Sequence, residues 1–199
     1  MIYPINFPAH APATERLVLN RRQSVGESPW TYAQQTVNTA SQWVLEWTWP
    51  PVSHREAEAI AGWLMSLKGQ IGSFRYQPRQ SVTSGLAGRV LNLPGYAYND
   101  TVSVGGWGAN AASTLRVGQY MQIGDQLLRV IEAAAFADAN GLVTISFEPE
   151  LRADLAAGTA VNFANPSGIF RLGSSDSVGF TLTPDKKPVF GTITAREAI

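Results

Sequence analysis

Residues 41–49 read Ser-Gln-Trp-Val-Leu-Glu-Trp-Thr-Trp. Large apolar side chains recur here at every second position, and the positions between them are mostly polar. A period of two places successive side chains on opposite faces, so the stretch predicts a strand with one buried face. The same alternation returns at Phe74 and Tyr76. The buried face carries Trp43, Leu45, Trp47 and Trp49.

Between these two strands the spacing changes to that of a helix over residues 53–68. Ser53 followed by Glu56 is a capping box, and the two prolines before Ser53 prevent an earlier start. Gly69 supplies the stop. The apolar positions that recur with helical spacing are Ala57, Ile60, Ala61, Leu64 and Leu67.

Strands are also expected around Leu17 and Leu19 and over residues 169–172, with a closing hairpin from Phe180 to Ala195. Together with the helix they predict one domain, the hub, made of residues 1–80 and 166–199. The hub core is expected to contain Trp43, Leu45, Trp47, Trp49, Ile60, Leu64, Leu67, Phe74, Tyr76, Phe170 and Phe180.

Residues 81–165, here called the insert, have a different composition. They are rich in Gly, Ala, Asn and Thr, lack Lys, and carry four Arg against seven Asp and Glu. Short strands are expected at 89–93, 101–104, 119–123, 126–131, 142–147 and 160–163. Gly124-Asp125 and Asn140-Gly141 are turn signals between them. This spacing predicts a small barrel or sandwich, which we expect to be a barrel of OB-like or galectin-like kind. The fold class is therefore mainly β with one flanking helix.

Charge and cysteine content exclude several functions. The chain has 199 residues with 15 basic and 15 acidic side chains, which argues against coating a nucleic acid. Charged residues make up 15%, below the roughly 25% of an average domain. A surface so poor in charge suggests that other protein covers part of it. The absence of Cys removes thiol catalysis and Cys-ligated metals.

Neither a membrane anchor nor a secretion signal is expected. No apolar run approaches the roughly 18 residues that cross a bilayer. Residues 1–13 lack a basic segment followed by an apolar block. We therefore expect synthesis in a cytoplasm and no membrane insertion.

The residues that catalysis needs do not form a convincing set. His10 lies in a Pro/Ala-rich arm and His54 at the start of the helix, so neither is expected to bind a metal or catalyse. Glu148 and Glu150 could be the paired carboxylates of a glycosidase, but Pro149 between them favours a solvated strand end. We expect no enzyme, no cofactor and no metal site.

Three aromatic residues of the insert offer an alternative. Trp107 follows Gly105-Gly106, and Tyr96 and Tyr98 lie nearby in the sequence. Together they predict either an aromatic platform for a sugar ring or partner protein, or the core and rim of the small barrel.

Several stretches, taken in order, resemble the distal tail proteins of bacteriophages with long non-contractile tails. The first runs from Ser41 through Pro-Pro to Leu64. The second is 67–74 (Leu-Lys-Gly-Gln-Ile-Gly-Ser-Phe), and the third is 117–130 (Val-Gly-Gln-Tyr-Met-Gln-Ile-Gly-Asp-Gln-Leu-Leu-Arg-Val). The fourth is 147–152 (Phe-Glu-Pro-Glu-Leu-Arg), and the fifth is 165–172 (Asn-Pro-Ser-Gly-Ile-Phe-Arg-Leu). The order extends from about Pro12 to the C-terminus.

The resemblance implies a structural virion protein at the distal end of the tail. It implies a homo-hexameric ring whose β-barrel or sandwich hub binds the tail tube protein on one face. A tail-tip hub or tail-associated protein would lie on the other face, and DNA would pass through the central channel. The second domain decorates the ring. The alternative is a carbohydrate-binding module of the tail tip, used in host adsorption. A cell-wall hydrolase is disfavoured.

Overall fold

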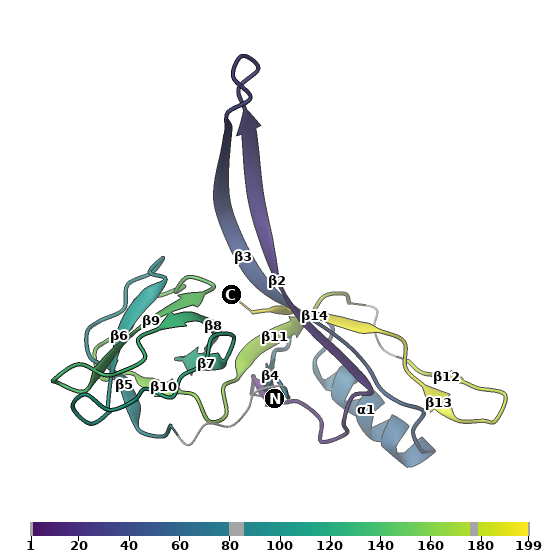
Figure 1. Ribbon diagram of the computed structural model, residues 1–199. Coiled ribbons are helices and arrows are strands. Elements are labelled where there is room, and N and C mark those ends of the chain that lie inside the picture. The colour runs from purple at the N-terminus through teal and green to yellow at the C-terminus, as the bar shows by residue number, and fades with distance from the viewer. Residues whose placement is uncertain (1, 80–85, 176–178, 199) are drawn as a thin grey trace. The chain divides into compact units, whose positions relative to one another are not determined.

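The structure is a computed structural model that describes residues 2–79, 86–175 and 179–198. These residues form two compact units (Figure 1). Unit 1 comprises residues up to Phe74 together with those from Phe170 onward, and unit 2 comprises Arg75–Ile169. The division lies a few residues from the boundaries expected at 80/81 and 165/166.

A six-stranded sheet organises unit 1 (Figure 1). Its order is β1 (Ile5–Asn6), β4 (Phe74–Tyr76), β11 (Gly168–Leu172), β14 (Ile193–Glu197), β3 (Gln34–Thr48) and β2 (Thr14–Glu27). The pairings of β14 with β11 and β3, and of β3 with β2, are antiparallel. Strands β4 and β11, which lead out of unit 1 and back into it, are therefore neighbours in one sheet.

The inner half of β3 confirms the strand predicted from the alternation. Trp43, Leu45, Trp47 and Trp49 are each at most 2% exposed, and the residues between them are half-buried. Leu45 lies opposite Leu17 on β2 and opposite Ala195 on β14. An antiparallel strand that packs one face on the core and leaves the other partly exposed explains this alternation.

The predicted helix is also present, as α1 (His54–Ser66). Ser53 is its N-cap, and the Ser53 hydroxyl accepts a hydrogen bond from the Glu56 N–H while the Glu56 carboxylate accepts one from the Ser53 N–H. Leu67 is the C-cap, and Lys68 and Gly69 follow with φ of 50° and 66°. A glycine at this point ends the helix without the strain that a side chain would meet.

An aromatic cluster joins α1 to the sheet. The ring of Phe7 lies 5.5 Å from those of Trp47 and Trp63 and 5.8 Å from that of Phe74. Phe74 stacks on Phe170 at 6.2 Å. Edge-to-face pairs of this kind add to the stabilisation that burial alone provides. All the predicted core residues are buried except Phe180.

Phe180 is a correction. Its side chain is 38% exposed and meets only one side of the core, edge-on to Phe190 at 5.8 Å. It directly precedes β12 (Thr181–Leu182), which pairs with β13 (Pro188–Val189) as a small separate hairpin. The predicted closing hairpin is therefore shorter than expected, because β14 leaves it to join the main sheet.

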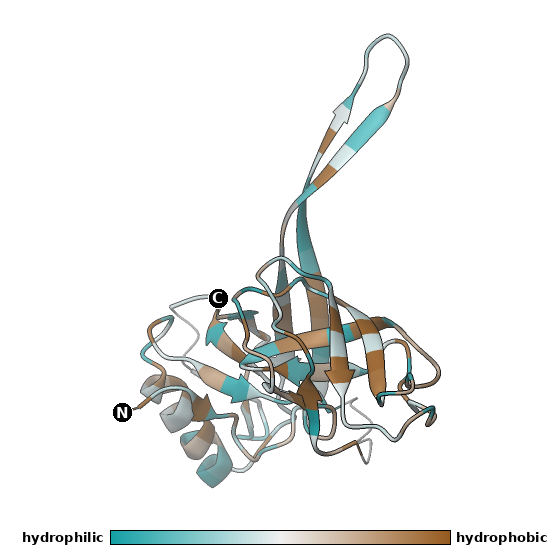
Figure 2. Ribbon diagram, turned by 90° about the vertical axis from the view of Figure 1, so that its left-hand side faces the viewer, coloured by the Kyte–Doolittle hydropathy of each residue, from teal (hydrophilic) through white to brown (hydrophobic). Residues whose placement is uncertain are grey.

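The largest difference from the sequence-based expectation is a long arm. Strands β2 and β3 remain paired far beyond the body of the sheet, as far as Glu27 opposite Gln34 (Figure 1). The outer part of this hairpin, residues 20–40, is here called the arm; the side chains described there are exposed except that of Ser28, which is half-buried. A bulge between Arg22 and Gln23 shifts the register. Figure 2 shows the outer arm as mostly hydrophilic, with isolated hydrophobic positions.

Unit 2 contains a closed six-stranded barrel, as the strand spacing predicted. Around the barrel run β10 (Ala160–Asn162), β5 (Arg89–Leu91), β6 (Thr101–Gly105), β9 (Leu142–Glu148), β8 (Gln126–Ala133) and β7 (Tyr120–Ile123). Each predicted strand overlaps one of these. Gly124, with φ of 60°, and Asp125 form the two-residue turn between β7 and β8. Closure leaves no unpaired edge.

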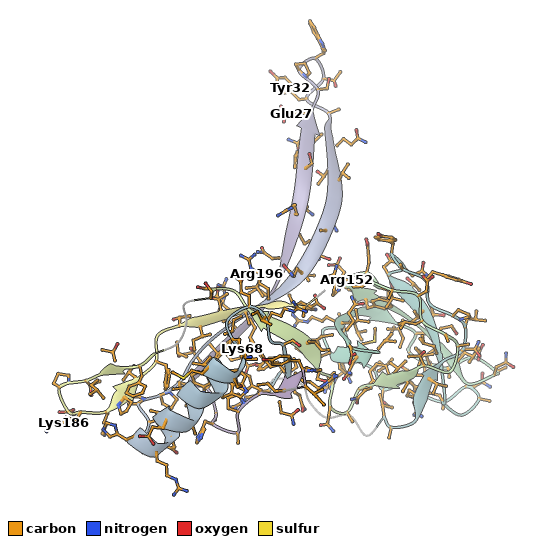
Figure 3. The ribbon with its side chains drawn as sticks, turned by 180° about the vertical axis from the view of Figure 1, so that it is seen from behind. Glu27, Tyr32, Lys68, Arg152, Lys186 and Arg196 are labelled. Atoms are coloured by element: carbon orange, nitrogen blue, oxygen red, sulfur yellow. The ribbon has the colours of Figure 1, made fainter. Side chains whose placement is uncertain are left out.

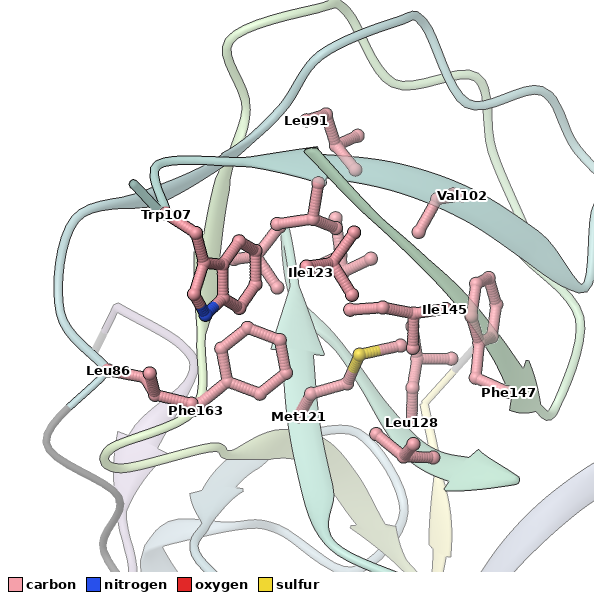
Figure 4. Close-up of a cluster of buried hydrophobic side chains, with 14 of the residues drawn as sticks. Leu86, Leu91, Val102, Trp107, Met121, Ile123, Leu128, Ile145, Phe147 and Phe163 are labelled. Atoms are coloured by element: carbon pink, nitrogen blue, oxygen red, sulfur yellow. The ribbon is translucent and has the colours of Figure 1, made fainter. Parts of the chain in front are cut away.

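The barrel interior is filled with side chains (Figure 4). Met121, Leu128, Ile145, Phe147 and Phe163 are fully buried there. Because the interior is a packed core, the barrel encloses no channel or ligand cavity among these residues.

Candidate functional surfaces

The side chains considered as catalytic candidates do not assemble into one site. The His10 Nδ1 lies 3.8 Å from the Glu56 Oε1, near the start of α1, and His54, the first residue of that helix, is exposed. Glu148 ends β9 in unit 2, and Glu150 is exposed beyond it. Across residues 2–79, 86–175 and 179–198, no three His, Cys, Asp or Glu side chains gather as metal ligands would.

Of the two interpretations left open for Trp107, Tyr96 and Tyr98, the structure supports barrel core for Trp107 and not an aromatic platform. Trp107 is only 8% exposed, and its ring lies 6.5 Å from that of Phe163 inside the barrel (Figure 4). Its indole N–H donates to the Ser113 carbonyl at 3.1 Å, and the Arg89 guanidinium covers the ring at 4.5 Å. With one face in the core and a cation over the ring, Trp107 closes the barrel and offers no flat surface to a ligand.

Tyr96 and Tyr98 remain on the surface, at 58% and 83% exposure. The loop that carries them is fixed by backbone hydrogen bonds to the segment 151–155. Gly95 and Leu155 exchange two of them, and the Tyr98 N–H donates to the Leu151 carbonyl at 2.7 Å. The Asp154 carboxylate accepts from the Ala97 N–H at 2.9 Å. The two tyrosines therefore lie on an ordered loop, which would lose little conformational entropy on binding a ligand.

The tip of the arm is a second candidate surface, which the sequence alone did not identify. Trp30 is 90% exposed and Tyr32 is 76% exposed. They lie in the loop 28–33 between β2 and β3, at the far end of the arm (Figure 3). Aromatic side chains are usually buried, because covering the large apolar surface of an indole ring is favourable. The signal in the sequence was a Trp and a Tyr between two long polar segments that lack core periodicity.

Hydrogen bonds hold the tip loop in one shape. The Ser28 N–H donates to the Ala33 carbonyl and the Tyr32 N–H to the Ser28 carbonyl, both at 2.9 Å. Glu27, directly before the loop, accepts from the Gln34 side-chain amide at 2.8 Å. Tyr32 adopts φ of 54°, which closes the turn. The two aromatic side chains are therefore displayed by an ordered loop.

The electrostatics of unit 1 show one perturbed acid. Hydrogen bonds from the Ser53 backbone and side chain, with a smaller contribution from His10, hold the pKa of Glu56 below its ordinary value of 4.5. The capping box accounts for this shift, because the ionised carboxylate is the form that accepts both hydrogen bonds. The perturbation belongs to a helix cap and marks no catalytic acid.

Comparisons with known proteins add no assignment. No protein-family model matches the chain, and a search of curated proteins finds no match. Within the described ranges, no helix is both long and apolar enough to cross a membrane. Function must therefore be inferred from the sequence, the fold and the exposed surfaces of the two units.

Proposed function

We propose that this chain is a structural protein of a bacteriophage tail, a ring-forming adaptor between the tail tube and the receptor-binding tip. The proposal extends the resemblance of residues 41–64, 67–74, 117–130, 147–152 and 165–172 to distal tail proteins. In this proposal unit 1 is the hub that forms the ring, and unit 2 decorates it. DNA crosses the central channel in transit only, and the chain takes part in no chemical step.

The observation that carries the proposal is the division into two β units. The segment between β4 and β11 of the helix-flanked sheet forms a closed barrel. The family resemblance implies the same organisation, in which a second β domain follows the strand after the helix. The likeness of the barrel to OB-like or galectin-like domains stays a prediction.

Surface composition supports assembly. Only 15% of the residues of the chain are charged, and the arm of unit 1 has an exposed aromatic tip, so both features suit contact with other protein. A ring subunit must cover two flanks and two stacking faces. A heterologous contact that closes by rotation produces a cyclic oligomer.

Two measurements test this function. Light scattering on the assembled protein is expected to give six copies of the 21.5 kDa chain, about 129 kDa. Gold-labelled antibody against unit 2 is expected to mark the end of the tail distal to the capsid. Labelling of the capsid or along the whole tube would contradict the proposal.

A second candidate function rests on the two exposed tyrosines. We infer that Tyr96 and Tyr98, with the nearby Asp154 carboxylate, suit a sugar ring, which stacks on aromatic faces and donates hydroxyls to carboxylates. In this alternative the chain is a carbohydrate-binding module used in host adsorption. A glycan array with wild type, Tyr98→Ala and the control Phe136→Ala, also exposed on unit 2 at 65%, tests it. Binding lost only in Tyr98→Ala supports the module; no binding to any glycan rejects it.

A further inference from the structure

The arm is a hairpin that projects from unit 1 with most of its side chains in water. A two-stranded hairpin by itself is marginally stable in water, yet β2 and β3 continue as a pair from Asn20 to Glu27 with exposed side chains. Eight residues of strand extend the arm by about 27 Å. At its end stands an ordered loop with Trp30 and Tyr32 in water. An ordered loop with two exposed aromatic side chains is suited to bind an apolar surface.

Unit 1 also carries an unpaired apolar area at the C-terminal end of α1. Met65 is 64% exposed and Ile71 is 70% exposed. Ile2, at 92% exposure, precedes Tyr3, whose hydroxyl donates to the Ser66 carbonyl at 2.7 Å and so ties this part of the chain to the end of α1. Here these three residues are called the helix-end patch. Met and Ile side chains are favourable partners for an aromatic ring, and thioether–aromatic contacts add to the burial.

The tip cannot reach the helix-end patch of its own chain. The arm leaves the sheet in the direction away from α1 (Figure 1). Its paired strands keep it extended, since β2 and β3 form cross-strand pairs along their length with a single register shift. The tip and the helix-end patch of one chain are therefore held apart, and a contact between them requires two molecules.

Charge favours the same pairing. Glu27 is the acidic residue that begins the tip loop, and Lys68 lies between Met65 and Ile71 in the sequence (Figure 3). Both are exposed. Opposite charges at the rim of an apolar contact steer the two surfaces together and fix their orientation.

We propose that the arm tip of one copy docks on the helix-end patch of a second copy, with Trp30 and Tyr32 packed against Met65 and Ile71 and with Glu27 facing Lys68. The contact joins two different surfaces, so repetition by rotation generates a ring. This inference rests on the self-assembly that the proposed function requires, and it names the surfaces through which copies meet.

Charge reversal tests the pairing directly. Glu27→Lys and Lys68→Glu are each expected to weaken self-association in analytical ultracentrifugation at low salt, and the double variant to restore it. Lys186→Glu is the matched control, because Lys186 is also exposed and also has a positive φ, 58° against 50° for Lys68. Circular dichroism checks that each variant is folded.

The aromatic anchor has its own variant. Trp30→Ala is expected to weaken self-association by about thirtyfold, the scale of an interface hot spot. Val25→Ala, which shortens an exposed side chain on β2 within the arm, is expected to change self-association little. Self-association that is insensitive to both Trp30→Ala and charge reversal would overturn the tip contact and leave the ring proposal standing.

Two other results also decide the matter. Wild-type protein that stays monomeric at every concentration would overturn both the inference and the self-assembly beneath it. Binding of the tip to a different tail protein, lost in Trp30→Ala and unaffected by Lys68→Glu, would overturn the second copy as partner.

Discussion

At the scale of single residues, Leu64 and Met65 are neighbours on α1 with opposite environments. The Leu64 side chain lies on the buried face of α1 and is fully buried, whereas that of Met65 is 64% exposed. Leu64→Ala is expected to lower the free energy of unfolding by about 2–5 kcal/mol, the cost of a buried leucine and its cavity. Met65→Ala is expected to change it by less than about 0.5 kcal/mol. Denaturant unfolding of both variants checks the contrast, which equal stabilities would refute.

Trp107 calls for the same measurement in unit 2. The sequence left open whether Trp107 belongs to an aromatic platform or to the core and rim of the barrel. Its burial among the barrel side chains supports the second interpretation. Trp107→Ala is now expected to cost about 3–5 kcal/mol, and Tyr98→Ala, at an exposed site, to cost far less. A barrel that melts unchanged without Trp107 would mean that its ring is not part of the core.

The capping box gives a pH dependence. Because the folded chain lowers the pKa of Glu56, its carboxylate stays ionised to a lower pH in the folded than in the unfolded chain. Its contribution to stability is therefore fully present above the ordinary value of 4.5 and is lost as the pH falls through the lowered folded value. The difference in melting temperature between wild type and Glu56→Gln should therefore shrink as the pH is lowered below the ordinary value of 4.5.

Glu58→Gln is the matched control for that titration. It removes an exposed carboxylate from the same helix without touching Ser53. A wild-type advantage over Glu56→Gln that persists undiminished at the acidic end would show that the ionised carboxylate does not stabilise the cap.

At the scale of elements, the arm should be dispensable for folding. Replacing residues 23–39 with Asn-Gly joins Arg22 to Ala40, its partner on the returning strand, through a turn that favours hairpins. Little buried surface is lost, since the described side chains of this segment are exposed apart from the half-buried Ser28. The shortened chain is expected to keep the thermal midpoint of unit 1 and to lose self-association. Unfolding of unit 1 would show instead that the arm supports the sheet.

The elements that the sequence predicted are those whose period reports a buried face. Residues 41–49 alternate because only one face of β3 is buried, and Ile60 and Leu64 recur because one face of α1 is buried. The arm carries no such signal, because both faces of a projecting hairpin are wet and its Val25 and Val37 are isolated. Trp107 was ambiguous for a different reason. A glycine pair marks a turn and says nothing of which way the next side chain points.

Among the candidate sites, the exposed tyrosines were predictable and the docking surfaces were not. Tyr96 and Tyr98 lie in a Gly- and Pro-containing loop, where exposure is the ordinary expectation. The tip and the helix-end patch are far apart in the chain, and their relation depends on how the hairpin projects. That projection depends on tertiary pairing of β2 with β3, which local periodicity does not encode.

At the scale of the whole molecule, unit 2 should be removable. Strands β4 and β11 are neighbours in the sheet, and the Gln77 side-chain amide donates to that of Asn165 at 3.2 Å. A short Gly/Ser linker in place of residues 78–164 therefore spans a small gap. The remaining chain is expected to fold with a cooperative transition by circular dichroism. Only insoluble or unfolded protein would show that the two units are not independent.

The most direct test of the proposed ring adaptor is a cryo-electron-microscopy reconstruction of the distal end of the tail that contains this chain. A ring adaptor is expected to show six copies in a closed ring between the tube and the receptor-binding tip, with unit 1 lining the channel. Density for the chain in the receptor fibres, in the capsid or in an open helical array along the tube would contradict it.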